Sequence, residues 1–144
     1  KEDFARNHPG GELGKQLALK VENIMHPIND VAQINNKDSI SSCAKKMTDN
    51  PLGAALLLEN GSLKGIVTEG DLRKSIASNL DLSNSIEPFI NDNPISIHSS
   101  VSILDAMKIM EDRSSKISCL PVVDSDGKCL GLLTIHDLYQ TKLV

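Results

Sequence analysis

Aromatic residues are nearly absent from this chain of 144 residues: they make up 2% of it, and there is no tryptophan. Proteins that bind single-stranded nucleic acid stack the bases on aromatic side chains, so the composition disfavours that class. An excess of positive charge is missing as well, because 15 Lys and Arg stand against 19 Asp and Glu, for a net charge of −4. Without a basic field, we expect binding to neither nucleic acid nor an anionic membrane surface.

Cysteine pairs and long apolar runs are also lacking. The three cysteines, Cys43, Cys119 and Cys129, include no Cys-x-x-Cys spacing, so neither a metal site nor a disulfide framework is predicted. No apolar run approaches the roughly 18 residues of a membrane span, and no signal peptide is visible. We therefore expect a cytoplasmic protein. Because the chain begins with Lys1 rather than Met, we also expect it to be a piece of a longer protein.

A repeat organises what is present. Residues 65–72 (GIVTEGDL) recur 66 positions later as residues 131–138 (GLLTIHDL), with Gly, Thr, Asp and Leu in common. The turns at 59–62 and 125–128 share this offset, and an Asn-Gly or Asp-Gly pair between apolar runs predicts a β-hairpin. The predicted strands are 54–58 with 63–67, and 120–123 with 129–133.

Helical periodicity flanks each hairpin. Apolar residues at i, i+3, i+4 and i+7 begin at Ile40 and again at Ile103, so each set lines one face of a helix. Further helices are predicted at 71–76 and 137–143. The repeated unit is therefore βαββα. One copy of about 55 to 60 residues would bury too little apolar surface alone, so we expect the two copies to pack together.

Two βαββα units that each end in Gly-h-h-Thr-x-x-Asp, where h is apolar, resemble a tandem pair of CBS domains, known as a Bateman module. Residues 21–25 and 86–90 resemble the segments that lead into the two copies. The resemblance implies an α/β (α+β) fold of two repeats related by a pseudo-two-fold axis, each with a small three-stranded sheet backed by two helices. It implies a first CBS repeat at residues 21–78, a linker at 79–84 and a second repeat at 85–144.

The N-terminal segment carries a more specific resemblance. Residues 4–14 (FARNHPGGELG) are similar to the segment that joins a SIS (sugar isomerase) domain to a CBS pair in arabinose-5-phosphate isomerases, and residues 68–73 resemble that family's first copy. These enzymes interconvert D-arabinose 5-phosphate and D-ribulose 5-phosphate, toward Kdo and lipopolysaccharide. The resemblance implies that residues 1–20 are the linker from a SIS domain of the same chain. The rest is then a regulatory part that is inactive alone.

One residue of this segment is a catalytic candidate. In the resembling isomerases the His of His-Pro-Gly-Gly lies near the sugar-phosphate site, which implies this role for His8 in the intact enzyme. Moving a proton between adjacent carbons needs an acid–base group with a pKa near neutrality, and imidazole fits. The alternative is a plain linker at residues 9–11 in which His8 is inert.

The repeated motif supplies the main ligand-binding candidates, Thr68 and Asp71 in the first copy and Thr134 and Asp137 in the second. In CBS pairs that bind ligands, the hydroxyl meets a phosphate or ribose and the carboxylate accepts hydrogen bonds from ribose hydroxyls. The motif falls where a strand gives way to a helix N-terminus, whose free N–H groups favour an anion. The alternative is that each Thr is a simple N-cap, which suits these residues better than a capping box, and that no ligand binds.

Further candidates surround these motifs. Arg73 would add positive charge to the first cleft, so we do not expect the two copies to be equivalent. The resemblance implies that Met25 and Ile90 flank a bound base, with burial in the core as the alternative. It also implies that Pro121 and Val122, which begin the second hairpin, wall the cleft.

The function expected from these residues is regulatory. A small phosphorylated ligand, a nucleotide or nucleotide sugar, would bind between the copies and bias the attached isomerase through its different affinity for two arrangements. The expected effector is CMP-Kdo, with an adenine nucleotide as the general CBS alternative, and no cofactor is required. The resemblance implies a homodimer through the CBS pairs, or a tetramer of the full-length enzyme. Two rival hypotheses are an oligomerisation module without a ligand and a CBS sensor on another protein.

Overall fold

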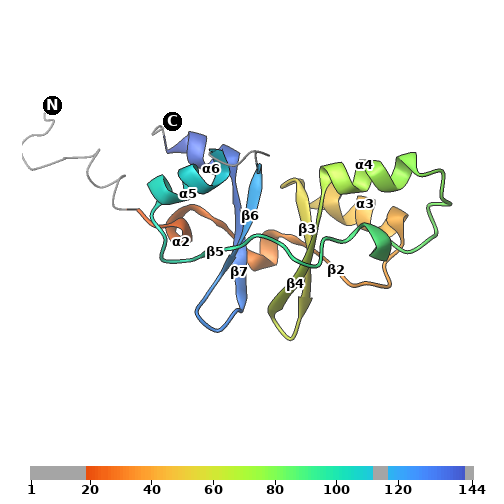
Figure 1. Ribbon diagram of the computed structural model, residues 1–144, viewed down its shortest axis with the longest axis horizontal. Coiled ribbons are helices and arrows are strands. Elements are labelled where there is room, and N and C mark those ends of the chain that lie inside the picture. The colour runs from red at the N-terminus through yellow and green to blue at the C-terminus, as the bar shows by residue number, and fades with distance from the viewer. Residues whose placement is uncertain (1–18, 112–116, 142–144) are drawn as a thin grey trace, which may run out of the picture.

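The computed structural model describes residues 19–111 and 117–141. Two small sheets stand side by side at the middle of the molecule, and each has helices on one side of it (Figure 1). The chain is therefore a mixed α+β fold of two similar halves, as the repeat predicts. Within the described ranges, every helix is too short or too polar to cross a membrane, and no group of His, Cys, Asp and Glu side chains is arranged to hold a metal ion.

The strands and helices follow the predicted order. The strands are β1 (His26–Pro27), β2 (Ala32–Ile34), β3 (Ala54–Glu59), β4 (Ser62–Thr68), β5 (Ile97–His98), β6 (Cys119–Val123) and β7 (Cys129–Thr134). The helices are α2 (Val21–Ile24), α3 (Ile40–Asp49), α4 (Glu69–Ala77), α5 (Ile103–Glu111) and α6 (Ile135–Gln140), with 3-10 turns η1 (Ile28–Asp30) and η2 (Glu87–Phe89). One sheet has the order β2-β3-β4 and the other β1-β7-β6-β5. Both predicted hairpins are confirmed.

Local sequence accounts for these elements. Asn60 and Gly61 join β3 to β4 with φ angles of 53° and 84°, the left-handed backbone that a two-residue hairpin turn requires. Helix α3 begins where the Ser39 side chain accepts a hydrogen bond from the backbone N–H of Ser42, and it buries the predicted apolar stripe. The buried side chains of this stripe are Ile40, Cys43 and Met47.

The segments that lead into the two halves change places. Strand β1, which precedes the first half, pairs antiparallel with β7 of the second, with His26 opposite Leu132. In the same way, Asn91 of the segment that precedes the second half exchanges two backbone hydrogen bonds with Ile66 of the first half, at 2.9 and 3.0 Å. The sheet of the second half therefore has four strands rather than the expected three. Each leading segment therefore packs on the other half and not on its own.

Two glycines make this exchange possible. A Cβ atom placed on Gly131 would collide with the carbonyl oxygen of His26, and one placed on Gly65 would lie 2.6 Å from Ile90 Cγ2 and 3.1 Å from the carbonyl oxygen of Asn91. Only a residue without a side chain lets the crossing segment approach so closely. The glycine that opens each repeated motif thus allows the leading segment of the other half to pack against it.

The core has three parts. One cluster belongs to each half, and each takes in the other half's leading segment: Val21 packs in the second half and Ile86 in the first. A third cluster lies between the sheets and draws on both halves. Its buried members are Val31, Ala54, Leu56, Ile66, Cys119, Cys129 and Leu132. The halves are therefore packed face to face as one body.

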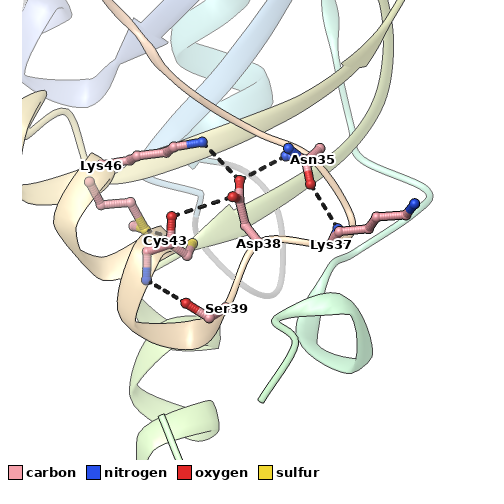
Figure 2. A network of polar contacts seen from close by, with 8 residues as sticks. Asn35, Lys37, Asp38, Ser39, Cys43 and Lys46 are labelled. Atoms are coloured by element: carbon pink, nitrogen blue, oxygen red, sulfur yellow. Dashed lines mark hydrogen bonds and ion pairs between the residues drawn. The ribbon is translucent and has the colours of Figure 1, made fainter. Parts of the chain in front are cut away.

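A polar network fixes the start of α3 in the first half (Figure 2). Asp38 Oδ2 accepts hydrogen bonds from Lys46 Nζ at 2.9 Å and from the backbone N–H of Asn35 at 3.0 Å, and Oδ1 accepts one from Ser42 at 3.3 Å. Burial acts to raise the pKa of Asp38, but the hydrogen bonds from Lys46 and Asn35 outweigh it and hold that pKa below its ordinary value. The ionised carboxylate is therefore the stable form in the folded protein.

Candidate functional site

The repeated motif forms the junction between β4 and α4. The backbone N–H of Asp71 donates to Thr68 Oγ1 at 3.3 Å, while Asp71 Oδ2 accepts from the backbone N–H of Thr68 and from its hydroxyl, both at 3.0 Å. This reciprocal pattern is a capping box in which Asp takes the place that Glu usually holds. The expectation of a simple N-cap is wrong here.

The second half repeats this arrangement between β7 and α6. The backbone N–H of Thr134 donates to Asp137 Oδ2 at 2.8 Å, and that of Asp137 donates to Thr134 Oγ1 at 3.1 Å. In both halves the Thr thus caps its helix, as the alternative interpretation of the sequence predicts, but within a capping box and not as a simple N-cap. Capping does not occupy every acceptor, because within the described part of the chain Oδ1 of Asp71 accepts no hydrogen bond.

A cleft opens beside Thr68, between the two halves. It consists of a pocket of about 300 Å³ and an adjoining pocket of about 160 Å³, which share Thr68, Ile117 and Cys119. We call the two together the Thr68 cleft. The first pocket is also lined by Gly53, Glu69, Gly70, Arg73 and Ser118, and the second by Ile66, Asn91 and Ile95.

The two ends of the Thr68 cleft differ in chemistry. At the polar end, a Cβ placed on Gly70 would lie 3.7 Å from Thr68 Oγ1 and 3.9 Å from Arg73 Nη2, so the hydroxyl and the guanidinium flank the same point at the N-terminus of α4. The other end is walled by the apolar side chains of Ile66, Ile95 and Ile117. This arrangement suits a ligand with an anionic group at one end and a flat apolar group at the other.

The equivalent place in the second half is different. There His26 Nε2 lies 2.9 Å from Asp137 Oδ1, and the side chains are 35% and 11% exposed. Thr134 is buried, whereas Thr68 is half-buried. The expected difference between the copies is therefore present, but its main cause is His26, which sequence reasoning missed. No motif marks His26 in the sequence, because its place beside the second motif comes from the long-range pairing of β1 with β7.

Four predicted ligand contacts are not among the residues that line the Thr68 cleft, and two of them, Met25 and Ile90, are partly buried. Met25 packs against the core of the second half, with its sulfur 3.0 Å from where a Gly131 Cβ would be, and Ile90 packs against the core of the first. Val122 is completely buried, and Pro121 is buried opposite a strand of the same sheet. Hydrophobic contacts account for all four positions, and a role in ligand binding stays a prediction.

Other residues were missed or fall elsewhere. Asn91, Ile95 and Ile117 line the cleft from irregular segments that carry no motif, so only the folded arrangement identifies them. Thr68 and Arg73 line the cleft, whereas Asp71 is not among its lining residues. The candidate catalytic residue His8 lies outside the described residues.

The fold and the cleft define a class: a paired-repeat α+β module with a ligand-sized cleft between its halves. Residues 21–78 and 86–142 each match the CBS domain family. The chain belongs to the CBS domain family and carries two such domains.

Curated relatives point to one group of enzymes. The chain is 39% identical over 141 residues to arabinose 5-phosphate isomerase KdsD of Pseudomonas aeruginosa, which covers 96% of this chain and 43% of that protein. It is 37% identical over 144 residues to KdsD of Francisella tularensis, covering 99% of this chain and 43% of that protein. The resemblance to arabinose-5-phosphate isomerases is confirmed, and the chain spans less than half the length of these relatives.

Solved structures share the fold. A crystal structure of CBSX2 in complex with AMP has a TM-score of 0.71 at 21% identity and covers 86% of this chain and 96% of that chain. The CBS domain pair of MJ0100, in complex with 5-methylthioadenosine and S-adenosyl-L-methionine, has a TM-score of 0.74 at 24% identity, with 85% and 94% covered. The predicted fold of two CBS repeats is confirmed.

Proposed function

We propose that this chain is the ligand-sensing part of a cytoplasmic arabinose 5-phosphate isomerase and that it binds a phosphorylated nucleoside in the Thr68 cleft. The observation that carries the proposal is the pairing of an anion-binding end, made by Thr68, Arg73 and the N-terminus of α4, with an apolar end. A phosphate at one end and a base at the other match these two environments.

Each side chain has a role in this proposal. Arg73 Nη2 donates to the phosphate, and a guanidinium is well suited to a charge-assisted, bidentate contact. The Thr68 hydroxyl, which donates to Asp71 Oδ2 in this structure, turns to donate to the phosphate when the ligand binds. Asp71 Oδ1 accepts hydrogen bonds from the ribose hydroxyls, while Oδ2 keeps its place in the capping box. The base lies against Ile95 and Ile117, which are drawn from irregular segments on either side of the cleft.

The charge of the cleft limits the ligand. Among the described lining residues, Arg73 is the one cation, and Glu69 lines the same pocket. One cation beside one carboxylate favours a ligand with a single phosphate over one with three. Of the two expected effectors, CMP-Kdo and AMP each carry one phosphate. The AMP complex of CBSX2 supports the adenine nucleotide, and the likeness to the isomerases supports CMP-Kdo as a feedback effector.

Regulation follows from where the ligand sits. Because the cleft draws Thr68 and Arg73 from one half and Ile117 and Ser118 from the other, a ligand in it stabilises one arrangement of the halves. In the full-length enzyme, a homodimer or tetramer through the CBS pairs would pass this preference to the SIS domain and to its acid–base residue His8. The chain alone then lacks isomerase activity.

A second candidate function is a purely structural module that oligomerises the isomerase. One observation favours it: Thr68 and Asp71 already satisfy each other as a capping box, which gives them a purpose without a ligand. In that case substituting Asp71 changes stability alone. Under the ligand-binding proposal, Asp71→Asn also weakens binding.

Thermal melting with added ligand tests the proposal. With AMP or CMP-Kdo at 100 times its Kd, the folded state gains about 2.7 kcal/mol, which at roughly 2 to 4 °C per kcal/mol raises the midpoint by about 5 to 11 °C. Arg73→Ala abolishes most of this rise, and the matched control Lys74→Ala, one exposed position along α4, retains it. Midpoints that neither ligand moves would refute the proposal in favour of the structural module.

A further inference from the structure

Both carboxylate oxygens of Asp137 have a partner in the folded protein. Its Oδ2 accepts the backbone N–H of Thr134 at 2.8 Å, and its Oδ1 lies 2.9 Å from His26 Nε2. The Asp137 side chain is only 11% exposed. A ribose diol would need an acceptor at this place, and on Oδ1 it would have to share or displace His26.

The matching position of the first half leaves the acceptor open. Asn91 pairs with Ile66 on β4 as His26 pairs with Leu132 on β7, so the two side chains occupy equivalent positions beside the motif. The Asn91 side chain turns to its own loop, where Oδ1 accepts the backbone N–H of Asn93 at 3.0 Å. It makes no hydrogen bond to Asp71 within the described part of the chain.

The backbone holds His26 where it is. Strand β1 is paired with β7, and Gly131 lets the carbonyl of His26 come into direct contact with that strand. Pairing with β7 therefore places the backbone of His26 beside the second motif, and the imidazole reaches Asp137 from there.

The rest of the second site also lacks the groups that a phosphate needs. Tyr139 stands where the first half has Arg73, and His136 stands where it has Gly70. The His136 ring bonds to Gln140 at 3.1 Å along α6 and is exposed. Of the titratable side chains described around Asp137, His26 is thus the one paired with it.

We infer that His26 fills the second site in place of a ligand, so that each chain binds one phosphorylated nucleoside, in the Thr68 cleft. This inference rests on the proposed function, because it takes that cleft to be a nucleotide site. It adds that the response is that of a single site per chain, set by one histidine. Replacing His26 by the residue of the other half frees Asp137 Oδ1 for a second ligand, which binds more weakly than the first because Tyr139 stands in the place of Arg73.

Isothermal titration calorimetry with AMP and with CMP-Kdo on three proteins tests this. Wild type binds one ligand per chain, and His26→Asn binds a second ligand with lower affinity than the first. The reciprocal variant Asn91→His, which sets an imidazole beside Asp71, binds its ligand at least about tenfold more weakly than wild type. Both variants place in one half the residue that the other half carries at the equivalent position. Circular dichroism melting confirms that each variant is folded.

The outcomes separate the two ideas. Two ligands per wild-type chain, or one per folded His26→Asn chain, overturns the role of His26 and leaves the nucleotide site standing. If His26→Asn does not fold, the test is the variant Asn91→His: binding as tight as that of wild type would overturn the role of His26. Binding by His26→Asn alone refutes the Thr68 cleft and supports the role of His26, and binding by none of the proteins refutes both.

Discussion

Replacing Gly131 by alanine perturbs the crossing of the two halves at a single atom. The added Cβ would collide with the carbonyl oxygen of His26 and lie 3.0 Å from Met25 Sδ. A backbone oxygen cannot turn aside as a side chain can, so β1 must move away from β7. Overpacking costs typically 1–3 kcal/mol, and each strand hydrogen bond lost adds about 1 kcal/mol. We expect Gly131→Ala to lower the free energy of unfolding by about 2–4 kcal/mol.

Two other glycines provide matched controls. At Gly65 the added Cβ meets mainly Ile90 Cγ2 at 2.6 Å, the end of a side chain that can adjust, so Gly65→Ala costs less than Gly131→Ala. At Gly70 the nearest atoms are 3.7 Å away and the residue is helical, so Gly70→Ala is neutral or stabilising by up to about 1 kcal/mol.

Urea denaturation followed by circular dichroism at 25 °C measures all three variants. A domain of this kind has about 5–15 kcal/mol of stability in total, so a loss of 2–4 kcal/mol is easily resolved. If Gly131→Ala were as stable as wild type, or if Gly70→Ala were the most damaging of the three, the exchange of leading segments would not be the feature that joins the halves.

Two further predictions concern buried groups. Because the pKa of Asp38 is lowered on folding, its contribution to stability is complete above about pH 4 and is lost as the pH falls through the lowered value. Asp38→Asn is therefore expected to cost about 1–2 kcal/mol at pH 7 and much less at pH 3; an equal cost at both, by urea denaturation, would contradict this. Burial raises the pKa of the Cys43 and Cys119 thiols to about 11, so neither reacts with a thiol reagent at pH 8 until urea unfolds the chain. Rapid labelling of both thiols in the native protein would show that they are not buried.

Local features of the fold were predictable from the sequence. The pair Asn60 and Gly61 between apolar strands predicts a β-hairpin turn, and the apolar stripe of α3 follows the helical period. The repeat itself shows that both halves share one design. These signals lie within a few residues of one another, where backbone preference and periodicity are informative.

Long-range features were not predictable. The pairing of β1 with β7 joins His26 to Leu132, and β1 has only two residues, too few to show a periodic pattern. The cleft walls at Ile95 and Ile117 come from irregular chain. Asp71 was considered for a ligand or a simple cap, yet the shorter carboxylate reaches back to the Thr68 backbone as a Glu would. Tertiary placement decides these roles, and one sequence does not reveal it.

The most direct test of the account is a crystal structure of this chain grown with whichever of AMP and CMP-Kdo raises the melting midpoint more. The account predicts one nucleotide per chain, with its phosphate in hydrogen-bond contact with Thr68 Oγ1 and Arg73, its ribose on Asp71, and His26 still paired with Asp137. A nucleotide bound elsewhere, or with its phosphate away from Thr68 and Arg73, would contradict it.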